Sequence, residues 1–205
     1  MEIKLYKFLN NANNKTPKNV LVVGVIHGDE PIGEFLIEEF LKNKTRTIKN
    51  NLFYIPRLNF SNERKNSSNV DINRNFPSKN WELTKKEDNY FGGFEPNSEI
   101  ETKFLVNLTN EIKFDAIITI HTPYKIINYD GVNNPITLPL AKKISAFLNH
   151  PIEADIGYAT PGSMGTYFGV ERNIPIITIE CDEEAKKEEL YKKFEKLFYF
   201  LEKEF

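Results

Sequence analysis

The chain has 205 residues, of which 40% are hydrophobic and 13% aromatic, and its 27 basic and 29 acidic residues leave a formal charge of -2. This composition suffices for a packed core and argues against an intrinsically disordered chain. The near balance of charge argues against a nucleic-acid-binding protein or a basic membrane-surface protein.

The length and the absence of targeting signals predict one cytoplasmic domain. A chain of this length fits a single α/β domain, so we expect residues 1–205 to form one domain. The first residues lack the charged and apolar regions of a secretory signal, and no stretch approaches the ~18 apolar residues of a transmembrane helix. The single cysteine, Cys181, excludes an intrachain disulfide.

Aliphatic runs and segments with helical spacing alternate along the chain. The first run, VLVVGVI at 20–26, is typical of a strand covered on both faces. Three more strands are predicted at 51–58, 115–120 and 174–180. Helices are predicted at 31–42, 98–112, 136–148 and 183–204, the second starting with a capping box of Ser98 and Glu101. This alternation predicts an α/β fold with a largely parallel central sheet.

Imidazole and carboxylate groups occur where three predicted strands end. The first strand is followed by His27 and Glu30, the third by His121, and the fourth ends on Glu180. Ligands of open α/β sheets bind outside these strand ends. Two His and one Glu are a known ligand set for a catalytic zinc, so one Zn²⁺ ion is predicted on the first three residues. Glu180 is then the natural general base for a water molecule.

A second polar cluster lies in NVDINRNFPSKNW, residues 69–81. Arginine is scarce in this chain, and Arg74 beside Asn73 suits a bidentate grip on a carboxylate. The competing interpretation is a polar loop stabilised by its own Asn and Asp turns. Arg64 lies ten residues before Arg74, where it could reach a carbonyl oxygen that becomes an oxyanion.

Two other reactive side chains are assigned structural roles. Cys181 adjoins Glu180, so strand alternation points its thiol to the opposite face, where we expect it to pack. His150 lies before a proline in a loop, away from the predicted strand ends that carry the other imidazole and carboxylate groups, and we interpret it as structural.

Five motifs in this order resemble the zinc carboxypeptidase superfamily, and within it the murein peptide amidases. They are HGDE, DINRNFP, EPNSEIET, ITIHTP, and GYATPGSMGTYFG followed by IPIITIE. The resemblance implies a three-layer sandwich in which helices flank a mostly parallel, mixed central sheet. It also implies that His27, Glu30 and His121 bind one zinc ion and that Glu180 acts as general base and acid.

The resemblance assigns further residues to the substrate. Arg64 would stabilise the oxyanion, and Asn73 and Arg74 would hold the free α-carboxylate beyond the scissile bond. Tyr158 falls near the mobile tyrosine of the family. Met164 lies where carboxypeptidases line the pocket for the terminal side chain, and the alternative is a core-filling role in the following helix.

The implied reaction is hydrolysis of the amide between γ-D-Glu and meso-diaminopimelate in murein tripeptides, for peptidoglycan recycling in the cytoplasm. The nearest alternative is an N-acyl amino acid deacylase similar to succinylglutamate desuccinylase and aspartoacylase. A D,L-carboxypeptidase acting on murein is a second alternative, although it would need an export signal. A catalytically inactive ligand-binding module on the same fold is a third. We expect a small murein peptide as the partner, with no nucleic acid and no membrane, and a homodimer stays open.

Overall fold

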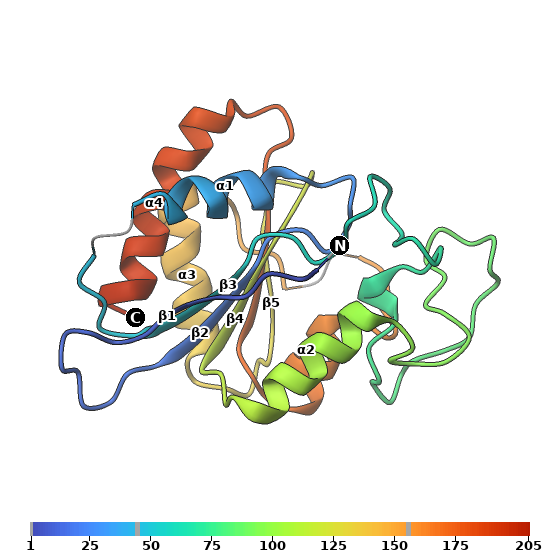
Figure 1. The fold of residues 1–205 in the computed structure, drawn as a ribbon. Coiled ribbons are helices and arrows are strands. Elements are labelled where there is room, and N and C mark those ends of the chain that lie inside the picture. Colours follow the sequence, from blue (N-terminus) through green and yellow to red (C-terminus); the bar gives the residue numbers. More distant parts are fainter. Residues whose placement is uncertain (1, 44–45, 155–156) are drawn as a thin grey trace.

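The protein is built around one mixed β-sheet, seen almost edge-on in the computed structural model (Figure 1), which describes residues 2–43, 46–154 and 157–205. Within these residues the strand order is β1-β3-β2-β4-β6-β5. The strands are β1 Tyr6–Phe8, β2 Asn19–Val23, β3 Asn51–Ile55, β4 Ala116–His121, β5 Ile127–Asp130 and β6 Ile176–Glu180. The four central strands run parallel, whereas β1 and β5 pair antiparallel at the edges. The predicted largely parallel sheet is therefore confirmed.

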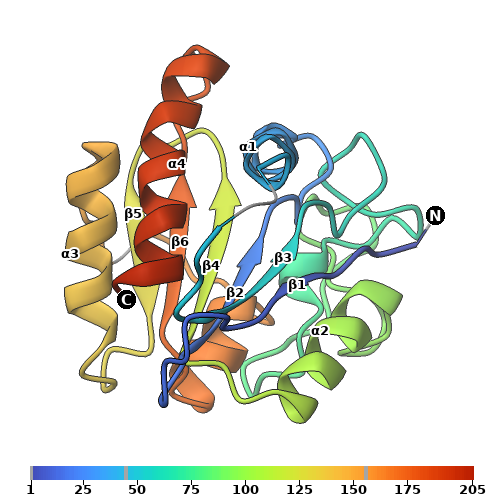
Figure 2. The same ribbon diagram turned by 60° about the vertical axis from the view of Figure 1, so that its left-hand side comes forward.

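Helices cover both faces of this sheet. They are α1 Ile32–Leu41, α2 Ile100–Glu111, α3 Thr137–Leu148 and α4 Lys187–Lys203, with a short π-helix η2 at Gly165–Glu171. Figures 1 and 2 show α1, α3 and α4 on one face, and α2 with the orange η2 on the other. The predicted three-layer arrangement is confirmed. Among the described residues, no helix has both the length and the apolar composition needed to cross a bilayer.

Each face of the sheet has its own apolar core. Along β2, Val20 and Val22 join the cluster under α1, α3 and α4, while Leu21 and Val23 join the cluster under α2 and η2. All four side chains are fully buried. A fully buried Val or Leu side chain contributes about 1.5–3 kcal/mol by leaving water, so a strand buried on both faces needs the aliphatic run that the sequence shows.

Two local predictions need correction. Strand β2 ends at Val23, so His27 and Glu30 lie in a turn after the strand and not at its end. The capping box at the start of α2 is wrong, because Ser98 donates to the Glu99 carboxylate (2.7 Å) and the helix has no side-chain cap. The Asn75 side chain, from the preceding segment, binds the start of the helix instead. Its Oδ1 accepts hydrogen bonds from the Glu99 N–H (3.1 Å) and the Thr102 hydroxyl (2.7 Å).

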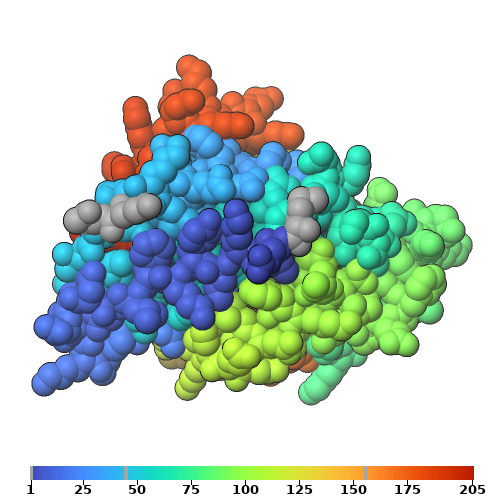
Figure 3. Space-filling model, viewed as in Figure 1, coloured from blue at the N-terminus to red at the C-terminus, as the bar shows by residue number. Residues whose placement is uncertain are grey.

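The long polar segment 59–97 wraps around the end of the sheet. It carries the 3₁₀ turn η1 at Ile72–Arg74, and in the space-filling view its cyan-to-green atoms form the right-hand side of the face (Figure 3). Asn75 anchors the segment, since its Nδ2 donates to the Gly92 carbonyl at 2.7 Å. The segment is thereby fixed beside the strand ends that carry the candidate site.

Candidate active site

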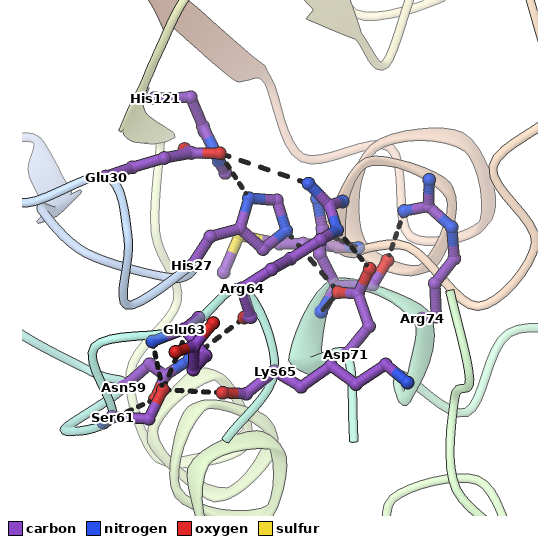
Figure 4. Close-up of polar contacts among 12 residues, drawn as sticks. His27, Glu30, Asn59, Ser61, Glu63, Arg64, Lys65, Asp71, Arg74 and His121 are labelled. Atoms are coloured by element: carbon purple, nitrogen blue, oxygen red, sulfur yellow. Dashed lines mark hydrogen bonds and ion pairs between the residues drawn. The ribbon is translucent and has the colours of Figure 1, made fainter. Parts of the chain in front are cut away.

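Three side chains from the ends of two strands meet in a buried cluster. His27 and Glu30 come from the turn after β2, and His121 is the last residue of β4. Glu30 lies between the two imidazoles, with its Oε1 2.8 Å from His27 Nδ1 and its Oε2 2.8 Å from His121 Nδ1. Both histidines are almost fully buried. The close-up shows this convergence (Figure 4).

The turn that presents His27 and Glu30 depends on a close backbone approach. The Gly28 N–H donates to the Glu63 carbonyl at 3.0 Å, and a Cβ at Gly28 would lie only 2.3 Å from the Ser61 carbonyl oxygen. Only glycine fits between these two backbone segments. The turn after β2 is therefore locked to the loop that precedes Arg64.

That loop folds on its own polar side chains. Asn59 Oδ1 accepts from the Ser61 N–H (2.9 Å), which closes a turn, and Asn59 Nδ2 donates to the Arg64 carbonyl (3.1 Å). The Ser61 hydroxyl donates to the carbonyls of Glu63 and Lys65. Figure 4 shows these contacts below the cluster. The predicted residue Arg64 is thus held beside His27 and Glu30, and its Nη1 lies 4.0 Å from Glu30 Oε1.

Asp71 links the cluster to Arg64 and is a site residue that was not predicted from the sequence. It is completely buried, its Oδ1 lies 3.4 Å from His27 Nε2, and its Oδ2 accepts from Arg64 Nε at 3.0 Å. A carboxylate behind a ligating imidazole fixes the ring and raises its basicity. The sequence feature that could have revealed Asp71 is its position two residues before Asn73. The Asp71 carboxylate accepts a hydrogen bond from the Asn73 N–H at 2.9 Å.

The electrostatics of the cluster favour positive charge between the carboxylates. Burial alone would lower the pKa of His27, but the hydrogen bonds and charges of Asp71 and Glu30 outweigh it and raise the pKa to about 9. Burial would raise the pKa of Glu30, yet the two histidines hold it well below its ordinary value. The charge of a cation at this position would be compensated in the same way.

The cluster fits a metal ion of the kind that the sequence predicts. One ligand atom from each of His27, Glu30 and His121 lies within 4.8 Å of the others. Two imidazole nitrogens and one carboxylate are the protein ligands of many catalytic zinc sites, which keep a further position for water. These three residues could therefore hold the predicted Zn²⁺ ion.

Glu180 lies next to this cluster. It is the last residue of β6 and is paired in register with His121 on β4. Its Oε2 is buried, and within the described residues it has no hydrogen-bond partner. Burial raises the pKa of its carboxyl above the ordinary value. The neighbouring Cys181 is fully buried in the core on the other face of the sheet, which confirms its predicted packing role.

Asn73 and Arg74 face the cavity that contains the cluster. Arg74 is 6% exposed and donates to the Asn73 carbonyl (2.8 Å), and among the described residues it forms no ion pair. The Met164 N–H donates to Asn73 Oδ1 at 2.9 Å, which fixes the orientation of the amide. A buried guanidinium with no carboxylate partner suits an anionic group of a ligand.

The cavity has a volume of about 310 Å³ and brings together all nine predicted site residues. Met164 lies at its wall and is also packed in the core with 2% exposure, so both of its expected roles are compatible with its position. Tyr158 is 44% exposed at the mouth. Tyr90 was not predicted from the sequence. Both arginine guanidinium groups lie over its ring, that of Arg64 at 5.1 Å and that of Arg74 at 5.2 Å from the ring centre.

Comparison with known proteins assigns the family. A sequence model of the zinc carboxypeptidases matches residues 1–146. The chain belongs to the zinc carboxypeptidase family. Murein peptide amidase A of Vibrio campbellii is 32% identical over 133 residues, which cover 61% of this chain and 52% of the relative. The Escherichia coli protein of that name is 29% identical over 128 residues, which cover 57% of this chain and 50% of the relative. The matched region thus spans about half the length of these relatives.

Solved structures confirm the fold. The murein-tripeptide amidase MpaA of Escherichia coli superposes with a TM-score of 0.77 at 23% identity, covering 96% of this chain and 85% of that one. Thrombin-activatable fibrinolysis inhibitor also superposes with a TM-score of 0.77, at 16% identity, covering 99% and 66% of the two chains. The predicted zinc carboxypeptidase-like sandwich is therefore confirmed.

Proposed function

We propose that this protein is a zinc-dependent amidase that hydrolyses the bond between γ-D-Glu and meso-diaminopimelate in murein tripeptides, for peptidoglycan recycling in the cytoplasm. One observation carries the chemical part: the general-base candidate Glu180 and a metal-ligand set share one cavity with the Arg74 guanidinium, which has no carboxylate partner among the described residues. The names of the similar amidases support the choice of substrate.

Each residue has a defined task in this reaction. His27, Glu30 and His121 would hold the zinc ion, which makes a water molecule acidic near neutral pH and polarises a carbonyl group. Glu180 takes a proton from the attacking water and gives it to the leaving amine nitrogen, which completes hydrolysis without another acid.

The remaining side chains bind and orient the substrate. Arg64 donates to the carbonyl oxygen as negative charge develops on it, while Asp71 fixes the position of its guanidinium. Asn73 and Arg74 hold the free α-carboxylate of the released residue. Tyr158 closes over the substrate from the mouth, and Met164 contacts the released side chain at the wall.

The test is mass spectrometry of L-Ala-γ-D-Glu-meso-diaminopimelate incubated with zinc-loaded protein, beside a panel of N-acyl amino acids and a murein tetrapeptide. Release of diaminopimelate that a chelator abolishes is the expected result. An intact tripeptide with deacylation in the panel assigns the protein to the deacylases, and loss of the terminal residue of the tetrapeptide alone assigns it to the D,L-carboxypeptidases. If all substrates stay intact while zinc is bound, the inactive binding module is favoured.

Replacing Arg74 with Ala should raise KM for a peptide with a free terminal carboxylate by about a hundredfold, because a charge-assisted bidentate contact is lost. The same peptide with an amidated terminus should lose little, since it offers no carboxylate. Steady-state kinetics on the two peptides check this, with the exposed Lys79→Ala as the matched control. An equal loss on both peptides would contradict the assigned role.

A further inference from the structure

Tyr90 contacts both arginines of the candidate active site with one aromatic ring. The Arg64 guanidinium lies over this ring at 5.1 Å from its centre, and the Arg74 guanidinium lies over it at 5.2 Å. The Tyr90 side chain is 48% exposed, and it lines both the active-site cavity and a second cavity of about 400 Å³. Packing in the apolar core therefore does not explain the presence of an aromatic residue at this position.

The backbone that carries Tyr90 is fixed to the segment that carries Arg74. The carbonyl of Phe91 accepts a hydrogen bond from the Asp71 N–H at 2.8 Å, and the Phe91 side chain is buried. At the next residue, a Cβ on Gly92 would lie 2.2 Å from the Arg74 carbonyl oxygen, so only glycine permits this close approach of the two backbones. The fold thus sets the position of the Tyr90 ring before any substrate binds.

The two guanidinium groups differ in their other contacts. Arg64 donates from its Nε to the buried Asp71 carboxylate at 3.0 Å. Arg74 donates to the Asn73 carbonyl at 2.8 Å, and it forms no ion pair within the described part of the chain. Holding a long arginine side chain in one orientation costs rotamer entropy, which its contacts must offset. The Tyr90 ring supplies a further contact to both groups.

Electrostatics explain why a neutral ring suits this position. Burial lowers the pKa of Arg74, and although Asp71 opposes this effect, the positive charge of Arg64 lowers the pKa further. The face of an aromatic ring carries partial negative charge and attracts a guanidinium, so a ring shared by two cations offsets part of their repulsion. A carboxylate in this position would occupy the N–H donors that the substrate needs, whereas a neutral ring leaves them free.

We propose that Tyr90 is a positioning residue that holds the Arg64 and Arg74 guanidinium groups where they meet the carbonyl oxygen and the terminal carboxylate of one peptide. The inference rests on the proposed function, which assigns these two tasks to the arginines. It also connects the tasks, because a single side chain contacts the group that stabilises the developing negative charge and the group that binds the substrate. The ring has this effect, and the hydroxyl is not required for it.

The experiment compares Tyr90→Leu, which removes the ring, with Tyr90→Phe, which keeps it. Steady-state kinetics of the zinc-loaded full chain are measured on L-Ala-γ-D-Glu-meso-diaminopimelate. In Tyr90→Leu, loss of the two cation–π contacts should lower kcat about tenfold through Arg64 and raise KM about tenfold through Arg74. Tyr90→Phe should stay within about threefold of the wild type in both constants. On the same peptide with an amidated terminus, Tyr90→Leu should lower kcat with little change in KM.

The matched control is Phe94→Leu. It removes another exposed aromatic ring of the same segment, one that packs on Phe91 with ring centres 5.1 Å apart, and should leave kcat and KM unchanged. Thermal melting of each variant checks the fold. If Tyr90→Leu melts early, Tyr90→Gln removes the ring with a polar side chain that suits a half-exposed position, and the same kinetic changes are expected of it.

Double-mutant cycles separate positioning from direct contact with the substrate. Added to Arg74→Ala, Tyr90→Leu should change KM by less than about twofold, and added to Arg64→Ala it should change kcat by less than about twofold. A full tenfold loss in either background would mean that Tyr90 acts on the substrate or through the Tyr158 ring, whose centre lies 6.5 Å away, and would overturn the assignment. A Tyr90→Phe variant as impaired as Tyr90→Leu would overturn it as well, because the effect would then belong to the hydroxyl.

A binding measurement distinguishes failure of this inference from failure of the proposed function. Calorimetric titration of free meso-diaminopimelate into the zinc-loaded protein reports the carboxylate contact without any turnover. If no peptide is cleaved but Tyr90→Leu weakens this binding about tenfold, and does so only while Arg74 is present, the amidase assignment fails and the positioning role stands. If the tripeptide is cleaved and folded Tyr90→Leu matches the wild type in kinetics and titration, the amidase assignment stands and the positioning role fails.

Discussion

Replacing Glu180 with Gln is expected to lower kcat by about a thousandfold to ten-thousandfold, or about 4 to 5.5 kcal/mol of activation free energy. Gln keeps the shape of the side chain but cannot accept the proton of the attacking water. The native carboxylate is prepared for that task, since its Oε2 is buried and has no partner among the described residues. The variant removes the proton acceptor and leaves His27, Glu30 and His121 in place.

Two measurements decide whether this loss is catalytic. Metal analysis of the purified variant should show the same zinc content as the wild type, because Glu180 is not among the three grouped ligands. Steady-state kinetics on the tripeptide should show the fall in kcat with little change in KM. Glu183→Gln, an exposed carboxylate three residues further along, should keep wild-type turnover. Full activity of Glu180→Gln would refute the proposed mechanism, whereas lost zinc would make Glu180 a structural residue.

The parts of this site that sequence reasoning found share one physical property. Each of the four central strands carries buried apolar side chains on both faces, so each contains an aliphatic run that is visible in the sequence. A polar residue that interrupts such a run at its end is conspicuous, and His121 and Glu180 were found in this way. His27 and Glu30 were found by the same reasoning although β2 ends earlier, because a backbone turn carries them to the same edge of the sheet.

The site residues that sequence reasoning missed do not lie at the end of an aliphatic run. Strand β5 is short, lies at an edge, and has the residues INYD, in which only Ile127 is fully buried. Its pairing with β6 is a long-range contact that local pattern does not encode, so Asp130, which lines the cavity, was not placed near the site. Asp71 was read as part of a polar loop because its partners, His27 and Arg64, are brought to it only by the folded chain.

A buried ion pair far from the site provides the largest expected effect on stability. Arg46 Nε lies 3.1 Å from Glu202 Oε1, and the two side chains are 2% and 0% exposed. The guanidinium also lies over the Phe40 ring, 4.3 Å from its centre, and donates to the Phe40 carbonyl at 2.8 Å. Arg46→Met keeps the apolar stem but leaves the Glu202 carboxylate buried without its partner. We expect a loss of about 3–5 kcal/mol in the free energy of unfolding at pH 8.

The loss in Arg46→Met should depend on pH in a defined direction. Burial raises the pKa of Glu202 to about 7 from its ordinary value of 4.5 even though Arg46 opposes it, so removing Arg46 raises that pKa further. Between 4.5 and the folded-state pKa, the native protein binds more protons than the unfolded chain, and its stability falls as pH rises. Urea unfolding should therefore show a smaller loss at pH 5, where the carboxyl is protonated and neutral, than at pH 8.

The exposed Lys42→Met, which removes a surface pair with Glu39, should cost less than about 1 kcal/mol at either pH. A loss in Arg46→Met that is equal at both pH values, or no larger than this control, would show that the buried carboxylate does not depend on Arg46.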